Sequence, residues 1–210
     1  NGVIIPGAGS NTYTALTAGS YTVRVFSPGN ALCNAVSAPV VVQVNTLPQA
    51  AVSPTGPIVF CSGNQAVISH TSVTGETYVW YKNGSPVPGA NSNSLTVTNS
   101  GDYTLEVTGS NGCSRLSNVV SITANPLPSP VITPANTVTL CDGGTLSIRA
   151  EDNPSYTYQW LSNGLPLAGT NNATLAVTGS GSYSVEMVNS VSGCSNTSGV
   201  TNVTIIAPPR

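Results

Sequence analysis

Hydrophobic and polar residues alternate over short stretches throughout the chain, which is the pattern of half-buried β-strands. The clearest stretches are residues 66–70, 78–80, 95–97, 103–107 and 120–124. Asn-Gly pairs accept the positive φ that tight hairpin turns require, and they separate strands at 83–84, 111–112 and 163–164. No stretch has a helical period. We therefore predict an all-β antiparallel sandwich fold, with no helix longer than about two turns.

The strand pattern repeats along the chain. Trp80 and Trp160 are 80 positions apart, and so are Cys61 and Cys141. The motif Tyr-x-Trp-x-x-Asn-Gly occupies 78–84 and 158–164. Because a fixed period over many markers indicates tandem domains, we predict two complete repeats of about 80 residues, 47–126 and 127–206.

The two ends of the chain match parts of a repeat. Asn1-Gly2 aligns with Asn83-Gly84, and Gly19-Ser20-Tyr21 aligns with Gly101-Asp102-Tyr103. We therefore expect residues 1–46 to be the second half of a truncated repeat, holding only its later strands. Residues 207–210 are expected to start the next linker, so that the chain is an internal piece of a longer secreted protein.

The order of Ile68, Trp80, Leu95 and Gly101-Asp102-Tyr103 resembles the immunoglobulin superfamily, in which a core Trp on strand C lies between strands B and F. The resemblance implies tandem immunoglobulin-like β-sandwiches. It makes the tryptophans core residues and the tyrosines corner residues, and it places two aliphatic pairs where antibody domains have their inter-sheet cysteines. The residues concerned are Trp80, Trp160, Tyr103, Tyr183, Ile68 with Leu105, and Ile148 with Val185.

A narrower resemblance rests on the motifs Cys61-Ser62-Gly63, Tyr78-Val79-Trp80, Gly181-Ser182-Tyr183 and Gly112-Cys113. This order is similar to the repeats of large Bacteroidetes cell-surface adhesins, including gliding-motility adhesins exported by the type IX secretion system. That family implies cell-surface display, adhesion and long multidomain stalks. Such repeats also serve as spacers in secreted enzymes.

Charge narrows the possible partners. The chain has 5 Lys and Arg against 7 Asp and Glu, a net charge of −2, and only 6% of its residues are charged. Because so few cations cannot form a basic surface, binding to nucleic acid is disfavoured. No run of about 18 apolar residues exists, so membrane insertion is not expected. The expected partners are neighbouring repeats of the same chain and a surface polysaccharide or another cell-surface ligand.

Candidate chemistry is sparse. His70 is the only histidine, and no nucleophile motif, phosphate loop or zinc pattern accompanies it. Glu151-Asp152-Asn153 is the only local acidic cluster, and solvated loop acids explain it better than a calcium site. We therefore expect a non-enzymatic chain without a cofactor or metal.

Five cysteines at repeating positions in an exported chain predict disulfides. One alternative pairs them within each repeat, Cys61 with Cys113 and Cys141 with Cys194. In the immunoglobulin register, however, Cys61 lies in the turn after strand A and Cys113 at the tip of the F–G hairpin, at opposite ends of one sandwich. In a head-to-tail array that turn meets the F–G tip of the next repeat. This favours a cross-repeat bridge between Cys61 and Cys194, with Cys33, Cys113 and Cys141 unpaired in this chain.

Two functions are compatible with these features. The first is a structural and adhesive segment of a large extracellular, cell-surface protein, forming an extended stalk that supports attachment; the adhesin resemblance implies a role in gliding motility. The alternative is a spacer or carbohydrate-binding accessory module of an extracellular enzyme.

Overall fold

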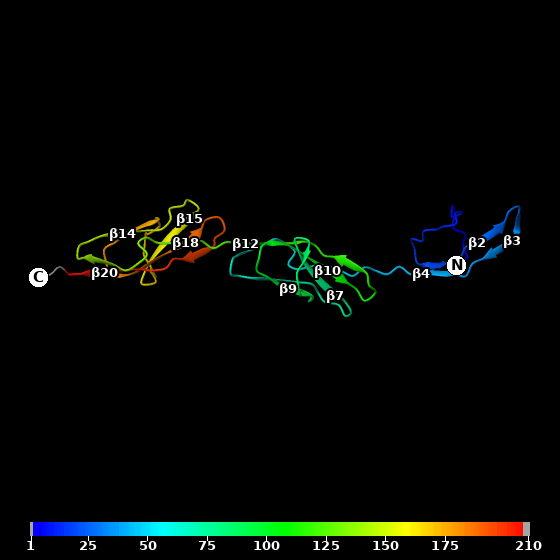
Figure 1. Ribbon diagram of the computed structural model, residues 1–210, viewed down its shortest axis with the longest axis horizontal. Coiled ribbons are helices and arrows are strands. Elements are labelled where there is room, and N and C mark those ends of the chain that lie inside the picture. Colours follow the sequence, from blue (N-terminus) through cyan, green and yellow to red (C-terminus); the bar gives the residue numbers. More distant parts are fainter. Residues whose placement is uncertain (1, 208–210) are drawn as a thin grey trace.

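The computed structural model describes residues 2–207, so most of the expected linker 207–210 lies outside the described residues. Three bodies follow one another along the long axis of the molecule (Figure 1). Every regular element in the described part is a β-strand, which confirms the predicted fold class. The described residues contain no helix that could cross a membrane.

The middle body is an asymmetric sandwich of two sheets. Its larger sheet has the strand order β5-β12-β10-β7-β8, with β11 paired to β10, and its smaller sheet is β6-β9. β5 and β12 are parallel, and the other neighbours are antiparallel. The strands are β5 (Ile58–Cys61), β6 (Ala66–Ser69), β7 (Thr77–Lys82), β8 (Ser85–Pro86), β9 (Ser94–Val97), β10 (Gly101–Thr108), β11 (Ser114–Leu116) and β12 (Val120–Asn125).

The C-terminal body repeats this topology strand for strand. Its larger sheet has the order β13-β20-β18-β15-β16, with β19 paired to β18, and its smaller sheet is β14-β17. The strands are β13 (Val138–Cys141), β14 (Leu146–Arg149), β15 (Tyr156–Ser162), β16 (Leu165–Pro166), β17 (Thr174–Val177), β18 (Gly181–Asn189), β19 (Ser195–Thr197) and β20 (Thr201–Ile206).

The N-terminal body has only two pairs of strands. β1 (Gly19–Tyr21) pairs with β4 (Val40–Val42), and β2 (Arg24–Ser27) pairs with β3 (Asn30–Val36), all antiparallel. None of the described side chains in residues 2–46 is buried. These strands therefore form a ribbon without a core of its own.

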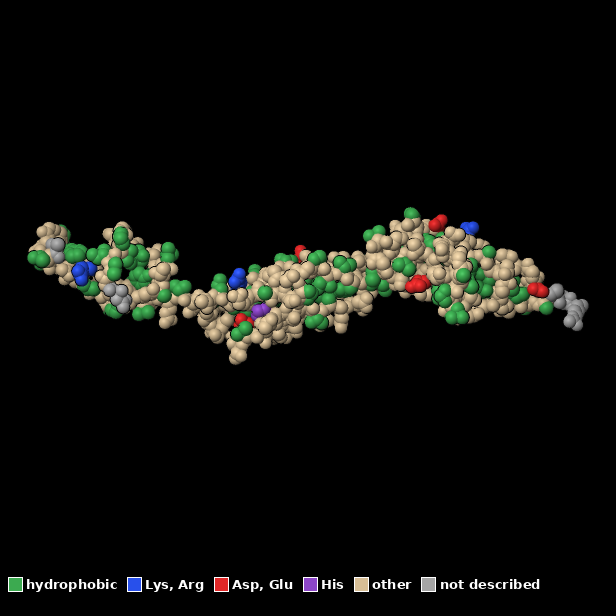
Figure 2. Space-filling view, turned by 180° about the vertical axis from the view of Figure 1, so that it is seen from behind, with side chains coloured by type: hydrophobic (Ala, Val, Ile, Leu, Met, Phe, Trp, Pro, Cys, Tyr) green, Lys and Arg blue, Asp and Glu red, His purple; other side chains and the backbone are tan. Residues whose placement is uncertain are grey.

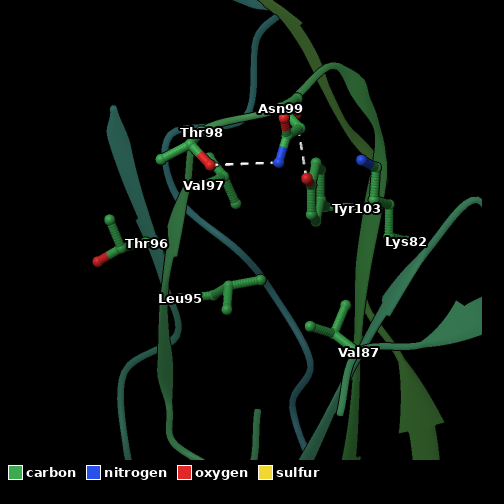
Figure 3. Close-up of a pocket in the computed structure, with 8 residues that line it drawn as sticks. All are labelled: Lys82, Val87, Leu95, Thr96, Val97, Thr98, Asn99 and Tyr103. Atoms are coloured by element: carbon green, nitrogen blue, oxygen red, sulfur yellow. Dashed lines mark hydrogen bonds between the residues drawn. The ribbon is translucent and has the colours of Figure 1, made fainter. Parts of the chain in front are cut away.

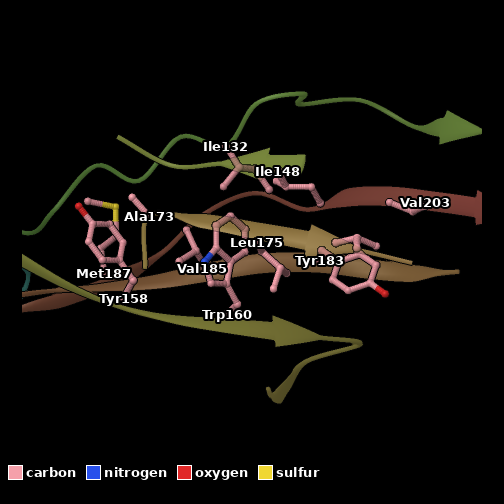
Figure 4. Packing of buried hydrophobic residues seen from close by; sticks show 11 residues of the cluster. Ile132, Ile148, Tyr158, Trp160, Ala173, Leu175, Tyr183, Val185, Met187 and Val203 are labelled. Atoms are coloured by element: carbon pink, nitrogen blue, oxygen red, sulfur yellow. The ribbon is translucent and has the colours of Figure 1, made fainter. Parts of the chain in front are cut away.

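Each sandwich has a separate hydrophobic core centred on its tryptophan. Trp80 and Trp160 are fully buried, and each indole N–H donates a 2.8 Å hydrogen bond to a backbone carbonyl, of Ser92 and Asn172 respectively. Figure 4 shows Trp160 between Ile148, Leu175 and Val185, with aromatic side chains on either side. Since no buried residue belongs to both clusters, each sandwich has the means to fold around its own core.

Two of the three Asn-Gly turns have the predicted geometry. Asn83 and Asn163 have φ values of 50° and 51°, and the glycines that follow them are also positive, so both pairs close two-residue hairpins. Asn111-Gly112 lies in the hairpin between β10 and β11, as predicted, but only its glycine has a positive φ and the turn is not a two-residue one. The reason is the wider loop between β10 and β11, in which Gly109 N–H donates to Cys113 O and the Asn111 side chain accepts from Cys113 N–H.

Candidate functional site

The feature that distinguishes this chain from two independent sandwiches is the junction between them, which contains Cys61 and Cys194. Cys61 ends β5, where it lies opposite Asn125, the last residue of β12. The next residue, Ser62, donates its N–H to Asn125 O at 2.7 Å. Because the chain leaves the middle sandwich directly after Asn125, this pairing holds Cys61 beside the exit to the next sandwich.

Cys194 reaches the junction from the other side. It lies in the loop between β18 and β19, where its carbonyl accepts a 2.9 Å hydrogen bond from Asn189 N–H. The Asn189 side chain accepts from the N–H groups of Val191 and Ser192, which fixes the shape of the loop. Cys194 is completely buried, although it lies at a hairpin tip.

The two cysteines form a disulfide. Their Cα atoms are 5.6 Å apart across a sequence separation of 133 residues, a distance in the usual range for this bond. The bridge joins strand β5 of one sandwich to the β18–β19 tip of the next. This is the cross-repeat pairing. It connects the two sandwiches covalently a second time, in addition to the linker.

The linker also contacts the hairpin tip. Asn196, next to the tip, donates its side-chain amide to Pro128 O at 3.0 Å. Pro126, Pro128 and Pro130 lie within five residues, and such spacing favours stiff, extended backbone. Sequence reasoning missed Asn196, because an Asn at a hairpin shows no sign of a partner 68 residues away.

The within-repeat pairing of the cysteines is wrong. Cys113 follows β10, whereas Cys61 lies level with the end of β12, and these strands run antiparallel from the pair Tyr103–Val120. The two cysteines are therefore about ten residue steps apart along the sheet, or roughly 30 Å. Cys113 is a partly exposed free thiol, and Cys33 and Cys141 are exposed free thiols.

The other residues singled out from the sequence lie inside the two cores. Tyr103 and Tyr183 are almost completely buried, and their hydroxyls donate to the carbonyls of Asn99 and Gly179, both at 3.0 Å. The aliphatic pairs are fully inaccessible to solvent. They are Ile68, Leu105, Ile148 and Val185.

A small hollow lies beside Tyr103 in the middle sandwich, between β9 and the β7–β8 hairpin (Figure 3). Val87, Leu95 and Val97 give it an apolar lining, and the Lys82 ammonium lies 5.8 Å from the centre of the Tyr103 ring. Ser162 stands at the position of Lys82 in the next sandwich. The contact between an ammonium group and the tyrosine ring is therefore not repeated in the next sandwich.

The polar residues of the middle sandwich pair with one another. His70 is 6% exposed; its Nδ1 lies 3.0 Å from Ala51 O and its Nε2 lies 3.3 Å from a Glu76 carboxylate oxygen. The Tyr78 hydroxyl donates to the same oxygen at 3.2 Å. Burial raises the pKa of Tyr78, and Glu76 adds to this increase. These hydrogen bonds connect the end of β6 to the start of β7, and all three polar side chains of the cluster take part in them.

A second tyrosine–carboxylate pair lies on the outer face. Tyr81 donates its hydroxyl to Glu106 at 2.8 Å, and this hydrogen bond raises the pKa of Tyr81 above 10.0, with smaller contributions from desolvation and from the charge of Glu106. The expected acidic loop contains exposed Glu151 and Asp152. No group of three His, Cys, Asp or Glu suited to a metal ion occurs among residues 2–207.

Comparisons with known proteins give distant structural likenesses. No protein-family model matches the chain, and no curated protein matches it. Solved structures that it resembles include immunoglobulin domains 1–4 of Sidekick-1 (17% identity, TM-score 0.32, 92% of this chain and 59% of that one) and an I-band fragment of titin (14%, TM-score 0.41, 76% and 65%). The fibronectin(III)-like modules of Clostridium thermocellum CbhA are another (13%, TM-score 0.35, 76% and 95%). The chain spans 59% of the Sidekick-1 fragment. The strand order of the two sandwiches and their buried tryptophans show an immunoglobulin-like β-sandwich fold.

Proposed function

We propose that this chain is a structural segment of a large secreted cell-surface protein, in which end-to-end sandwiches form an extended stalk that supports attachment. The observation that carries the proposal is the Cys61–Cys194 bridge between successive sandwiches. A spacer that must keep a distant binding site away from the cell benefits from junctions that neither bend freely nor open.

The covalent path through the junction supports a load-bearing role. Tension that enters at the N-terminal side passes along β5 to Cys61, crosses the bridge to Cys194 and leaves through β20. The residues between the two cysteines lie outside this path. Both tryptophan-centred cores belong mainly to this shielded segment, so they need not unfold for the chain to carry tension.

Disulfides persist in oxidising compartments, which supports an extracellular location. Charged side chains are few on the face shown in Figure 2, and the chain has a net charge of −2 and is rich in Ser, Thr and Asn. Such a surface suits many weak hydrogen-bonding contacts to a surface polysaccharide or another cell-surface ligand. Repetition of such contacts along a stalk gives strength through avidity. The adhesin resemblance adds export by type IX secretion and gliding motility to the proposal.

Antibodies against residues 127–206 provide the test. We expect them to label intact, non-permeabilised source cells and, as monovalent fragments, to reduce attachment to a surface. Labelling that appears only after permeabilisation would contradict the proposal. Attachment that is unchanged under saturating fragments would contradict the supporting role while leaving the location intact.

A further inference from the structure

Residues 2–46 contain the strand pairings of half a sandwich. In the middle sandwich Gly101, Asp102 and Tyr103 of β10 pair with Ile122, Ser121 and Val120 of β12. At the N-terminus β1 and β4 repeat this register, with Gly19, Ser20 and Tyr21 opposite Val42, Val41 and Val40. β2 pairs with β3 as the end of β10 pairs with β11.

Local hydrogen bonds repeat as well. The Tyr21 hydroxyl donates to Thr17 O four residues back, as Tyr103 donates to Asn99 O. Val23 N–H donates to the Ser37 hydroxyl at 3.1 Å, and the equivalent Leu105–Ser117 bond is 3.0 Å. The N-terminal ribbon thus has the conformation that the same strands have inside a complete sandwich.

Its core-facing side chains are nevertheless uncovered. Val23, Val25 and Val40 are 55%, 63% and 64% exposed. Their counterparts Leu105, Val107 and Val120 are all 0% exposed. Figure 2 shows hydrophobic side chains gathered on this terminal body. We call the surface formed by Val23, Val25 and Val40 the open face.

The N-terminal body lacks some of the strands of a complete sandwich, and the missing strands indicate what would cover the open face. In the middle sandwich β8 pairs with β7 and β9 pairs with β6. Residues 3–4 and 12–15, which align with β8 and β9, form no strand. Both partners, β6 and β7, belong to the Trp-bearing half. So do Ile68 and Trp80, which share one buried core with Leu105 and Val107.

We propose that the open face is covered by a Trp-bearing half-repeat with the pattern of residues 47–82. The alignment of Asn1-Gly2 with Asn83-Gly84, at the turn after β7, gives the point at which such a half-repeat can be fused to the chain. Gly2 and Gly84 have the same left-handed conformation, with φ of 84° and 78°. The proposal does not rest on the attachment role.

The same placement gives Cys113 a partner. Cys113 lies at the β10–β11 tip, as Cys194 lies at the β18–β19 tip. Its loop contacts the preceding linker through Asn111, which donates to Thr46 O at 2.9 Å, just as Asn196 contacts Pro128. The half-repeat brings the equivalent of Cys61 to this junction. Its thiol and that of Cys113 then lose two protons and two electrons to a disulfide oxidant such as oxidised glutathione, which becomes two thiols.

The experiment fuses a second copy of residues 47–82 ahead of Asn1 of the full chain, with Val59→Ile in the copy so that its peptides differ in mass. The matched control carries Trp80→Ala in the copy. Hydrogen exchange of Val23 and Val25 is compared between both fusions and the parent chain, and disulfides formed in glutathione buffer are mapped by non-reducing digestion.

We expect exchange at Val23 and Val25 to slow by at least ~100-fold in the fusion but not in the control, because only an intact core closes the sandwich. The cysteine of the copy should be linked to Cys113, with Cys61–Cys194 unchanged. Equal exchange in fusion and control would overturn the proposal. So would a parent chain that sediments as a dimer with Val23 and Val25 already protected, since a second copy would then cover the face. A copied cysteine that stays reduced, or bonds to Cys33, would overturn the Cys113 bridge.

Discussion

His70 and Glu76 form a buried pair on the middle sandwich, with His70 Nε2 3.3 Å from a Glu76 carboxylate oxygen and both side chains less than a tenth exposed. The other imidazole nitrogen faces Ala51 O, which can only accept a hydrogen bond. Both ring nitrogens therefore face hydrogen-bond acceptors.

We predict strong coupling between these two residues. Glu76→Gln removes the charged acceptor from a buried donor and should cost about 1–3 kcal/mol in the free energy of unfolding of the middle sandwich. His70→Ala places there the residue that the next sandwich has, Ala150. A double-mutant cycle by chemical denaturation should give a coupling energy of at least about 0.5 kcal/mol. Additive effects of the two substitutions would show that the contact contributes nothing.

Trp80→Ala tests whether the two sandwiches have separate cores. Loss of this fully buried ring should destabilise the middle sandwich by roughly 3–5 kcal/mol, because the neighbours fill the cavity poorly. The C-terminal sandwich should change much less, since arrays couple through their interfaces. Trp160→Ala is the matched control and should destabilise the C-terminal sandwich while leaving the middle one nearly unchanged. Equal shifts of both transitions in either variant would mean one cooperative unit.

The hydrogen bond from Tyr81 to Glu106 predicts a dependence on alkaline pH. The pKa of Tyr81 is higher in the folded chain than its unfolded value of 10.0, so the bond contributes stability below pH 10. That contribution is lost as the pH rises through the folded pKa. Glu106→Gln should lower the Tyr81 pKa, as measured by ultraviolet titration of tyrosinate. Glu186→Gln is the control, because Glu186 has Leu161 in place of Tyr81, and a similar change in both variants would contradict the assignment.

Much of the fold was predictable because strand period, Asn-Gly turns and the tryptophan spacing are local signals that agree with one another. Opposite placement of Cys61 and Cys113 in one sandwich was also predictable, since it follows from strand register. The His70–Glu76 pair and the Asn196–Pro128 contact were not. The His70–Glu76 pair depends on the conformation of the loop that follows β6. The Asn196–Pro128 contact depends on where two segments 68 residues apart meet. The spacing of residues in the sequence shows neither.

The wide loop at Asn111-Gly112 shows the same limit on a local scale. The dipeptide permits a tight turn, but the hydrogen bonds around Cys113 select a longer one. The uneven division of the strands into a large and a small sheet was likewise not predicted, because edge pairing depends on how the two sheets pack.

Single-molecule stretching of the chain from its two ends tests the central claim most directly. With the Cys61–Cys194 bridge intact, the 133-residue separation between the cysteines cannot contribute to the extension. Cys61→Ser should therefore lengthen the fully extended chain by roughly 440–480 Å, at 3.3–3.6 Å per residue, and Cys113→Ser, which removes a free thiol, should leave the extension unchanged. An oxidised chain that already reaches the length of the Cys61→Ser variant would contradict the covalent junction on which this account of the stalk depends.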